Sequence, residues 1–242
     1  MITVHDLSPN VAVIAEGPAP PLPASLEAEV AAIWERAKAG RPDGLFDGRI
    51  FSVAASARER ISGCFVPYRR LIAERANPKL FAGLQVRPLA VSGLLVSADG
   101  VVFGRRAAGL TEDAGRWELV PSGGVAPECA DASGRVDIRR QILAELAEEV
   151  GLDANDVSVS GPFCAVEDGD SHGVDIGIAL AIPLSGNEVR ACHARRGSLE
   201  YSEIAVVAQS AIPGFAASLG PELVAVSRAL LVQKGLLAPR IE

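Results

Sequence analysis

The stretch Gln141–Leu152, which reads QILAELAEEVGL, has the periodicity of an amphipathic helix that ends at a glycine. On a helix that advances about 100° per residue, the aliphatic side chains form one stripe that faces a core. Gly151 is the expected C-cap. The neighbouring face carries three acidic side chains: Glu145, Glu148 and Glu149.

These three glutamates are unfavourable for the helix that carries them. Like-charged side chains at i, i+3 and i+4 destabilise a helix by roughly 0.2–0.5 kcal/mol per pair. Each anion near a helix C-terminus costs about a further 0.3–1 kcal/mol of stability, because that end of the helix dipole is negative. No Lys or Arg lies three or four positions away on the same helix. Clustered carboxylates supply the oxygen ligands that Mg²⁺ prefers beside substrate phosphates. The helix therefore predicts a phosphate-handling metal site, with a solvated acidic face as the alternative.

Composition limits the class of protein. The chain has 242 residues, of which 49% are hydrophobic and 22% charged, which is enough apolar content for a full core. Its net charge of −7 comes without a Lys/Arg cluster that could follow a nucleic-acid backbone. No apolar run reaches the ~20 residues that span a bilayer, and residues 1–10 lack the basic-then-apolar order of a secretory signal. We expect a cytoplasmic protein with no nucleic-acid or membrane partner.

Residues 1–86 are predicted to form an N-terminal accessory unit. Residues 2–17 alternate apolar and polar side chains around a Ser-Pro-Asn turn and predict a hairpin. After the proline-rich segment 18–23, a helix is expected from Ser25 to Ala39, ended by Arg41-Pro42-Asp43-Gly44. A strand within 48–57 and a helix near 68–75 complete this unit.

Residues 87–242 are predicted to form a second, sheet-based domain. The segment PLAVSGLLVSADGVVFGRR consists of two apolar strands joined at Asp99-Gly100, a dipeptide favoured in tight hairpin turns. Further strands are expected at 117–120, 157–166, 174–183 and 203–208, followed by a C-terminal helix with Pro221 near its first turn and Gly235 at its end. Recurring hairpins between helices predict an α/β sandwich with a mixed sheet, not a doubly wound sheet.

The run from Trp117 to Leu152, WELVPSGGVAPECADASGRVDIRRQILAELAEEVGL, resembles the signature of the Nudix hydrolase family, G-x5-E-x7-R-E-U-x-E-E-x-G-U with U an aliphatic residue. The second half matches from Glu145 to Leu152. The segment Pro121–Gly124 is similar to the strand-to-loop turn of that family. The resemblance covers roughly residues 87–235 and implies a Nudix-type α/β/α sandwich.

Two departures from the signature concern its loop. Ala144 stands where the signature has arginine, and the segment between Gly124 and Glu145 is six residues longer. As a result Val136 stands where a loop glutamate is expected. In the family that arginine braces the loop glutamate. Here Arg139 or Arg140 is the candidate to brace Glu128 in the longer loop.

The resemblance implies a function for several side chains. Mg²⁺, with Mn²⁺ as an alternative, is assigned to the side chains of Glu145, Glu148 and Glu149 and the carbonyl of Gly124. Catalysis is assigned to Glu145 and Glu149. The resemblance does not identify the general base, for which Glu200, just before the strand expected at 203–208, and Glu128 in the loop are the candidates. The candidates for substrate binding are Arg106, Trp117 and Tyr68. Arg106 could instead be a surface strand end, and Trp117 could instead pack in the core.

The N-terminal extension resembles one particular branch of the family. The segments AIWERAKAG, GLFDGRIF and YRRLIAERANP, combined with a box that lacks its arginine, are similar to the UDP-sugar-hydrolysing branch of the family. This implies cleavage of a UDP-sugar to UMP and sugar 1-phosphate. The alternatives are an ADP-ribose or dinucleotide pyrophosphatase and a non-catalytic nucleotide-binding module. The family resemblance also leaves a homodimer open.

Overall fold

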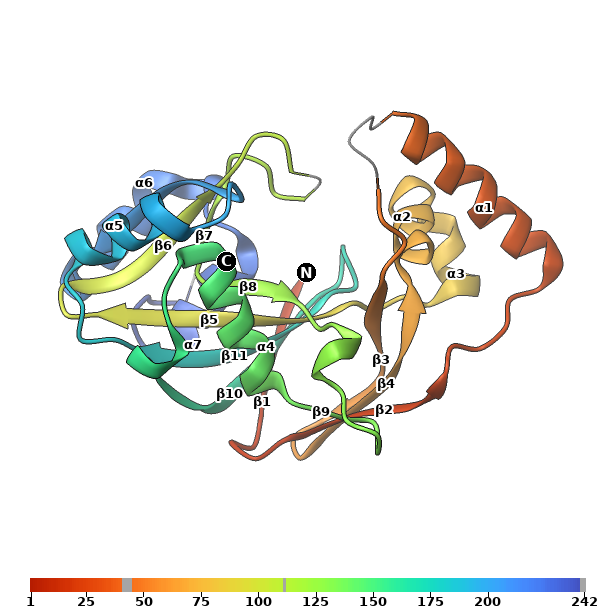
Figure 1. The fold of residues 1–242 in the computed structure, drawn as a ribbon, viewed down its shortest axis with the longest axis horizontal. Coiled ribbons are helices and arrows are strands. Elements are labelled where there is room, and N and C mark those ends of the chain that lie inside the picture. The colour runs from red at the N-terminus through yellow and green to blue at the C-terminus, as the bar shows by residue number, and fades with distance from the viewer. Residues whose placement is uncertain (41–44, 111, 240–242) are drawn as a thin grey trace.

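The computed structural model describes residues 1–40, 45–110 and 112–239. A large mixed sheet dominates it, with strand order β1-β10-β11-β5-β6-β12, β8 beside β5 and β7 beside β6 (Figure 1). Its eight strands are β1 (Ile2–Asp6), β5 (Leu89–Ser97), β6 (Gly100–Arg106), β7 (Trp117–Leu119), β8 (Ser122–Gly124), β10 (Ser158–Asp168), β11 (Val174–Ala181) and β12 (Tyr201–Val207). The predicted α/β class with a mixed sheet is confirmed.

The hairpin predicted at Asp99-Gly100 forms the centre of this sheet. Ser97 pairs with Gly100, and Val96 pairs with Val101. Gly100 has φ 151°, and a Cβ there would lie 2.1 Å from the Val207 carbonyl oxygen, so only glycine fits. Because β5 pairs with β11 in parallel and with β6 antiparallel, the sheet is mixed.

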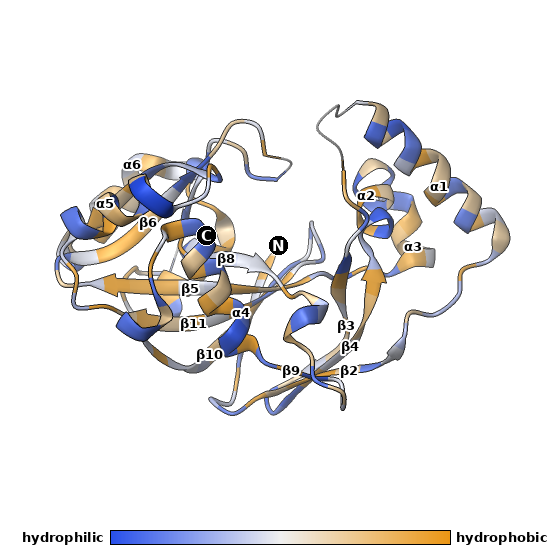
Figure 2. Ribbon diagram, viewed as in Figure 1, coloured by the Kyte–Doolittle hydropathy of each residue, from blue (hydrophilic) through white to orange (hydrophobic). Residues whose placement is uncertain are grey.

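Helices cover both faces of the large sheet. On one face α4 (Ile138–Glu145) and α5 (Gly186–Arg196) contribute buried side chains such as Ile142 and Val189 to one core cluster. On the other face α6 (Ile212–Leu219) and α7 (Ala225–Gln233) contribute Ile212 and Leu230 to another. The hydrophobic colour runs along β5, while the helices also show hydrophilic residues (Figure 2). This is the predicted three-layer sandwich.

The C-terminal segment contains the helix predicted after Pro221, which is α7, and one further helix before it, α6, that was not predicted. It forms α6 and α7, separated by the 3₁₀ turn Gly220–Glu222, which contains Pro221. Gly220 has φ 54°, and Pro221 supplies no backbone N–H, so a continuous helix cannot pass through them. Gly235, with φ 70°, follows the end of α7 as predicted.

A smaller sheet and three helices form the rest of the molecule. The sheet has the order β3-β4-β2-β9, and α1 and α2 pack together beside β3 and β4 (Figure 1). The elements are β2 (Ala12–Pro18), α1 (Ala24–Ala39), β3 (Arg49–Ala57), β4 (Arg60–Pro67), α2 (Tyr68–Ala76), α3 (Phe81–Leu84) and β9 (Arg135–Val136). The predicted strand and two helices are therefore present. The segment Arg41–Gly44, predicted to end α1, lies outside the described residues.

The predicted hairpin over residues 2–17 is wrong. β1 pairs with β10, beginning at Ile2 opposite Asp168, whereas β2 pairs with β4 and β9. A turn closes as Val11 N–H donates to the Ser8 carbonyl, but the chain then passes from one sheet into the other. β1 therefore joins the large sheet, and β9, from the second predicted domain, joins the small one.

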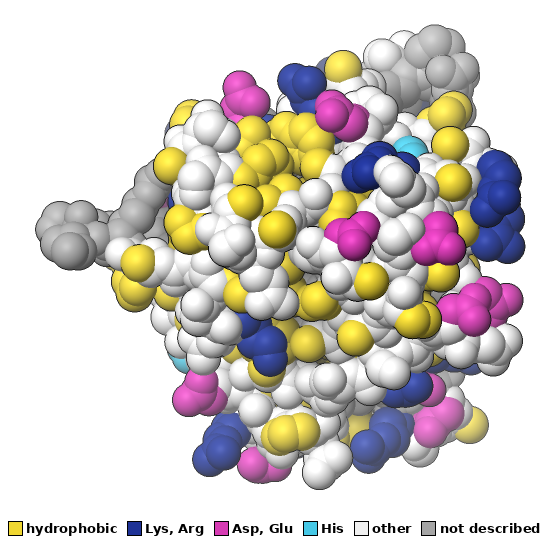
Figure 3. Space-filling model, turned by 90° about the vertical axis from the view of Figure 1, so that its left-hand side faces the viewer, with side chains coloured by type: hydrophobic (Ala, Val, Ile, Leu, Met, Phe, Trp, Pro, Cys, Tyr) yellow, Lys and Arg dark blue, Asp and Glu magenta, His cyan; other side chains and the backbone are white. Residues whose placement is uncertain are grey.

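The outer surface carries charges of both signs. On the face shown in Figure 3, acidic and basic side chains are interspersed, and hydrophobic side chains are scattered over it, with the densest group in its upper part. Within the described ranges, no helix is both long and apolar enough to cross a bilayer.

Candidate functional site

A cleft of about 620 Å³ opens beside the central strands. Small residues of β5 and β8 line it, namely Ala90, Ser92, Ser122, Gly123 and Gly124. Tyr68, Leu71 and Arg75 of α2 also line it, as do Arg106 at the end of β6 and Glu200 just before β12. The cleft thus brings together side chains from both predicted domains.

The glutamate segment follows α4 as predicted, but its final turn, Leu146–Val150, is a π-helix. Gly151, with φ 72°, caps it and donates its N–H to the Leu146 carbonyl. The turn leaves Glu148 exposed and Glu149 buried, with only 1% of Glu149 accessible. Single π turns inside helices are frequent at functional sites.

Glu149 is the most unusual group in this region. Its Oε2 accepts a hydrogen bond from the Ser122 backbone N–H at 3.0 Å, whereas its Oε1 is buried and has no hydrogen-bond partner among the described residues. Burial raises the pKa of Glu149 to about 10, and the charges of Glu200, Glu118 and Glu145 act in the same direction. A buried carboxylate without a positive partner is expensive, and a bound cation would remove that cost.

Glu145 lies one helical turn earlier, against strand β8. Its Oε1 accepts from the Gln141 side-chain amide at 2.6 Å. A Cβ on Gly123 would lie 2.2 Å from the Glu145 carboxyl carbon, so glycine at this position gives the carboxylate its room. Burial raises the pKa of Glu145, and the charges of Glu148 and Glu200 add to this effect.

The donor chemistry fits a hard divalent cation, since Glu145, Glu149 and Glu200 offer only carboxylate oxygens and Glu149 Oε1 is unpaired. Across the residues that the structure describes, no three His, Cys, Asp or Glu side chains form a ready-made metal group. Glu145 and Glu149 therefore have to approach one another to share an ion, with the Glu200 carboxylate nearby. The Glu148 side chain is exposed, and Gly124 lines the cleft beside Ser122.

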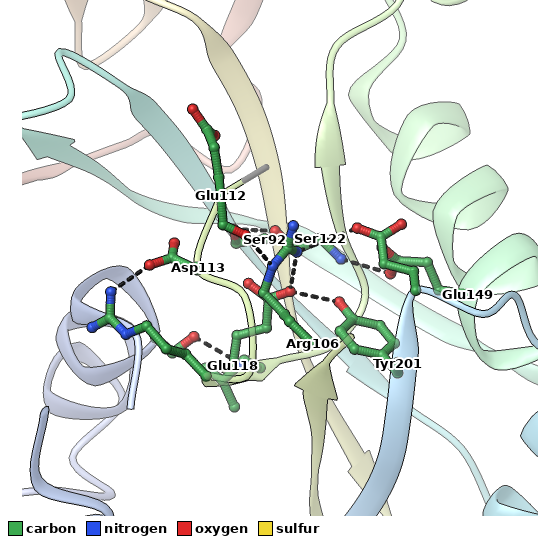
Figure 4. Close-up of polar contacts among 12 residues, drawn as sticks. Ser92, Arg106, Glu112, Asp113, Glu118, Ser122, Glu149 and Tyr201 are labelled. Atoms are coloured by element: carbon green, nitrogen blue, oxygen red, sulfur yellow. Dashed lines mark hydrogen bonds and ion pairs between the residues drawn. The ribbon is translucent and has the colours of Figure 1, made fainter. Parts of the chain in front are cut away.

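Arg106 connects the cleft to a buried polar network (Figure 4). Its Nη1 donates to Glu118 Oε1 at 2.6 Å and lies 3.3 Å from Glu200 Oε1. The Tyr201 hydroxyl also donates to Glu118 Oε1, at 2.9 Å. Arg106 therefore lines the cleft, with part of its guanidinium held by two glutamates, and its role in substrate binding stays a prediction.

The two predicted aromatic residues have different positions. Tyr68 lines the cleft and packs edge-on against Trp34, with 6.5 Å between ring centroids. Trp117 is 7% exposed and packs edge-on against Phe215 in the core. The prediction of Trp117 as a substrate-binding residue is therefore withdrawn in favour of the core-packing alternative, because its side chain points toward α6 and not into the cleft.

The loop predicted to be braced by arginine is held differently. Glu128 is exposed on the 3₁₀ turn Pro127–Cys129, and Arg139 Nη1 donates to the Val159 carbonyl at 3.1 Å. Gln141 takes the bracing position, because its Oε1 accepts from the Ala126 N–H at 3.0 Å. Val136 is buried in the small sheet through β9, which explains why no glutamate stands there.

Several polar residues of the site were missed from the sequence, among them Glu118, Gln141, Asp175 and Tyr201. Ser92 Oγ donates to Asp175 Oδ1 at 2.8 Å and lies 3.1 Å from Ser122 Oγ. Burial raises the pKa of Asp175 to about 6, with further contributions from acidic neighbours. The sequence did contain a sign of two of them, because a charged residue stands inside an otherwise apolar strand. Asp175 stands so in VDIGIALA, and Glu118 in WEL.

Asp175→Asn is expected to stabilise the protein at pH 8 by about 1–2 kcal/mol. This figure is lower than the full pKa shift would give, because the side chain is partly exposed and solvent screens it. The wild-type carboxyl has a folded-state pKa of about 6 against an ordinary 3.8, and Asp168, Glu112 and Asp113 contribute to the rise. The folded state therefore holds a proton that the unfolded state releases, so wild-type stability falls as pH rises from about 4 to 6. Asparagine can still accept from Ser92.

Urea unfolding of both proteins between pH 4 and pH 8 checks this expectation. The gain should disappear near pH 4 and be constant above pH 7. An equal gain at every pH would show that the ionisation of Asp175 is not its source.

No protein-family model matches the chain, and no curated protein matches its sequence. Among solved structures, DR0079 from Deinococcus radiodurans is similar with 12% identity, 75% of this chain and 96% of that chain covered, and a TM-score of 0.49. The MutT protein from Methanosarcina mazei Go1 has 21% identity, coverage of 62% and 92%, and a TM-score of 0.41. The NUDIX domain of Shewanella oneidensis NrtR, complexed with ADP ribose, has 17% identity, coverage of 67% and 94%, and a TM-score of 0.41. At these values the activity of this chain has to be inferred from its own residues.

Proposed function

We propose that the chain is a Mg²⁺-dependent Nudix-type pyrophosphohydrolase that cleaves the diphosphate of a nucleoside diphosphate linked to another group. The observation that carries this proposal is the buried, unpaired Oε1 of Glu149. Glu149 does not itself line the cleft, but its Oε2 accepts from the N–H of Ser122, which lines the cleft together with Glu200. The match of residues 145–152 to the family signature supports it independently.

The metal ligands of the proposal are Glu145 and Glu149, with the carbonyl of Gly124. Glu148, at the same turn, is exposed and is given only a minor share in holding the ion. Mg²⁺, or Mn²⁺ in its place, would supply charge neutralisation at the diphosphate and a lower pKa for the attacking water. The protein's own contribution is to place the carboxylates at one helix end, capped by Gly151, next to strand β8.

The charges in the cleft support a metal requirement. Six acidic residues line it, namely Glu112, Asp113, Glu118, Asp168, Asp175 and Glu200, against three arginines, Arg75, Arg106 and Arg116. Each of these arginines already forms an ion pair, with Glu112, Glu118 and Asp113 respectively. A diphosphate would therefore meet a net negative lining, and divalent cations would offset it.

Glu200 is our candidate for the general base. It lines the cleft, its side chain is 32% exposed, and its charge influences both Glu145 and Glu149. A carboxylate in this position can accept a proton from an attacking water. Glu128, the other candidate, is exposed on its loop and is not among the residues that line the cleft, so Glu200 is preferred.

A UDP-sugar is the proposed substrate, cleaved to UMP and sugar 1-phosphate. Ile50, Tyr68 and Leu71 give the cleft an apolar wall against which a flat base or sugar ring can pack. Ser92 and Asp175 offer hydrogen-bonding oxygens to hydroxyl groups on the same ligand. These features suit a neutral sugar, and an ADP-ribose or dinucleotide substrate would use the same diphosphate chemistry.

A substrate panel tests the proposal. The full chain is incubated with UDP-glucose, ADP-ribose and NADH, with Mg²⁺ or with EDTA, and products are separated by ion-exchange chromatography. We expect UMP and glucose 1-phosphate from UDP-glucose only when Mg²⁺ is present. Mg²⁺ should also raise the melting temperature, because it binds the folded state alone.

Each other outcome has a definite meaning. AMP from ADP-ribose or NADH, without UMP, would replace the UDP-sugar by an adenine nucleotide. Nucleotide binding without any metal-dependent product would favour a non-catalytic module. A melting temperature that Mg²⁺ does not change at any concentration would contradict the metal site itself.

A further inference from the structure

The side chain of Gln141 occupies a bridging position. It is 4% exposed and lies on α4 one turn before Glu145. Its Nε2 donates to Glu145 Oε1 at 2.6 Å, and its Oε1 accepts from the Ala126 N–H at 3.0 Å. One buried amide therefore joins the loop after β8 to a proposed metal ligand.

Contacts with both sheets, outside the cleft, hold this loop in place. It continues from Ala126 into β9, whose Val136 pairs with Val13 of β2 in the small sheet. On its other side, Val125 N–H donates to the Leu89 carbonyl of the large sheet. The Ala126 N–H is therefore a donor held by both sheets, and it fixes the orientation of the Gln141 amide.

The signature has an arginine and a loop glutamate that brace its loop, and this chain has uncharged residues at both positions. Ala144 is exposed and has no side chain that could reach the loop, and Val136 is buried in the small sheet. Gln141 is the residue whose side chain reaches both the loop and a glutamate of the box. Its amide group combines a donor and an acceptor in one side chain, which a carboxylate cannot do when ionised.

We propose that Gln141 is a positioning residue, which holds Glu145 in the orientation that binds the metal and replaces the missing arginine–glutamate brace. The inference rests on the proposed function. By engaging Oε1, the Gln141 amide directs Oε2, which accepts no hydrogen bond from the described residues, toward the ion. A donor that fixes a metal-bound carboxylate typically changes metal affinity by about 10–100-fold.

Mn²⁺ binding to the full chain, followed by the electron paramagnetic resonance signal of the free ion, tests this without requiring turnover. Gln141→Met keeps length and burial while removing both hydrogen bonds, and we expect about tenfold weaker Mn²⁺ binding. Arg140→Met, at the exposed neighbouring position, is the matched control and should change affinity by less than about twofold. Melting curves of each variant identify any loss of folding.

A double-mutant cycle separates positioning from a general structural role. If Gln141 acts through Glu145, Gln141→Met should change Mn²⁺ affinity by less than about twofold in a Glu145→Gln background. A tenfold effect that persists in that background would overturn the inference, because the loss would then not pass through Glu145.

The failure of the inference and the failure of the proposed function are distinguishable. If the wild type binds Mn²⁺ and Gln141→Met binds it equally well, only the role of Gln141 is overturned. If the wild type binds no Mn²⁺, the metal-dependent function is overturned, and the role of Gln141 falls with it. Gln141→Glu gives a second measurement should the methionine variant not fold, and it is expected to bind Mn²⁺ more weakly because it cannot donate to Glu145.

Discussion

Glu149→Gln is expected to lower Mg²⁺-dependent hydrolysis at least about a hundredfold while leaving the fold intact. The substitution preserves the size of the side chain and its acceptor for the Ser122 N–H, and it removes the charge that would hold the ion. In the metal-free protein burial raises the pKa of this carboxyl to about 10, so at neutral pH it has to take up a proton on folding, which lowers stability. A neutral amide should therefore raise the melting temperature in EDTA by a few degrees, about 1 kcal/mol.

The matched control for this variant is Glu148→Gln. Glu148 is on the same turn and undergoes the same chemical change, but it is exposed, so we expect less than about a tenfold loss. Turnover rates with UDP-glucose and melting curves with and without Mg²⁺ make the comparison. Equal rates for Glu149→Gln and the wild type would remove Glu149 from the metal site.

Gly123→Ala is the second substitution from which we expect a large loss, about 30- to 100-fold in hydrolysis. The added Cβ would lie 2.2 Å from the Glu145 carboxyl carbon, a separation that real contacts do not show. Glu145 would have to leave its position beside β8, and its bond to Gln141 at 2.6 Å would break. The apparent affinity for Mg²⁺ should fall together with the rate.

The neighbouring glycine provides the control. A Cβ on Gly124 would meet no atom within 4 Å, and alanine retains the backbone carbonyl proposed as a metal ligand. Gly124→Ala should therefore keep hydrolysis within about threefold of the wild type. Similar losses in both variants would mean that the loop, and not the room for Glu145, determines the rate.

The parts of the fold that were predicted correctly depend on local chemistry. The Asp99-Gly100 turn and the Gly151 cap are glycine positions with positive φ that the neighbouring pattern already indicates. The sandwich follows from apolar periodicity in the strands and in α4. The hairpin over residues 2–17 failed because strand pairing is non-local, and no periodicity shows that β1 pairs with β10, more than 150 residues away.

The site shows the same division. Clustered glutamates identified the helix end, but the π turn that separates buried Glu149 from exposed Glu148 depends on packing. The role of Gln141 could not be predicted, because its partner at Ala126 comes from an insertion whose path the sequence does not define. Trp117 in a short strand suited either the core or the cleft, and its contact with Phe215 decided for the core.

The pairing of β9 with β2 has a consequence for how this protein can vary. Six extra residues in the loop would ordinarily loosen the segment before α4, yet here they are tied into a sheet built by the N-terminal part of the chain. β1 forms the reverse tie, because it closes the edge of the large sheet. Each half of the chain thus supplies an edge strand to the sheet of the other half. Exchanging one half for a counterpart from another protein would therefore require rebuilding the other half as well. Changes in ligand preference within this lineage are then expected to come from single side chains lining the cleft and not from shuffling of modules.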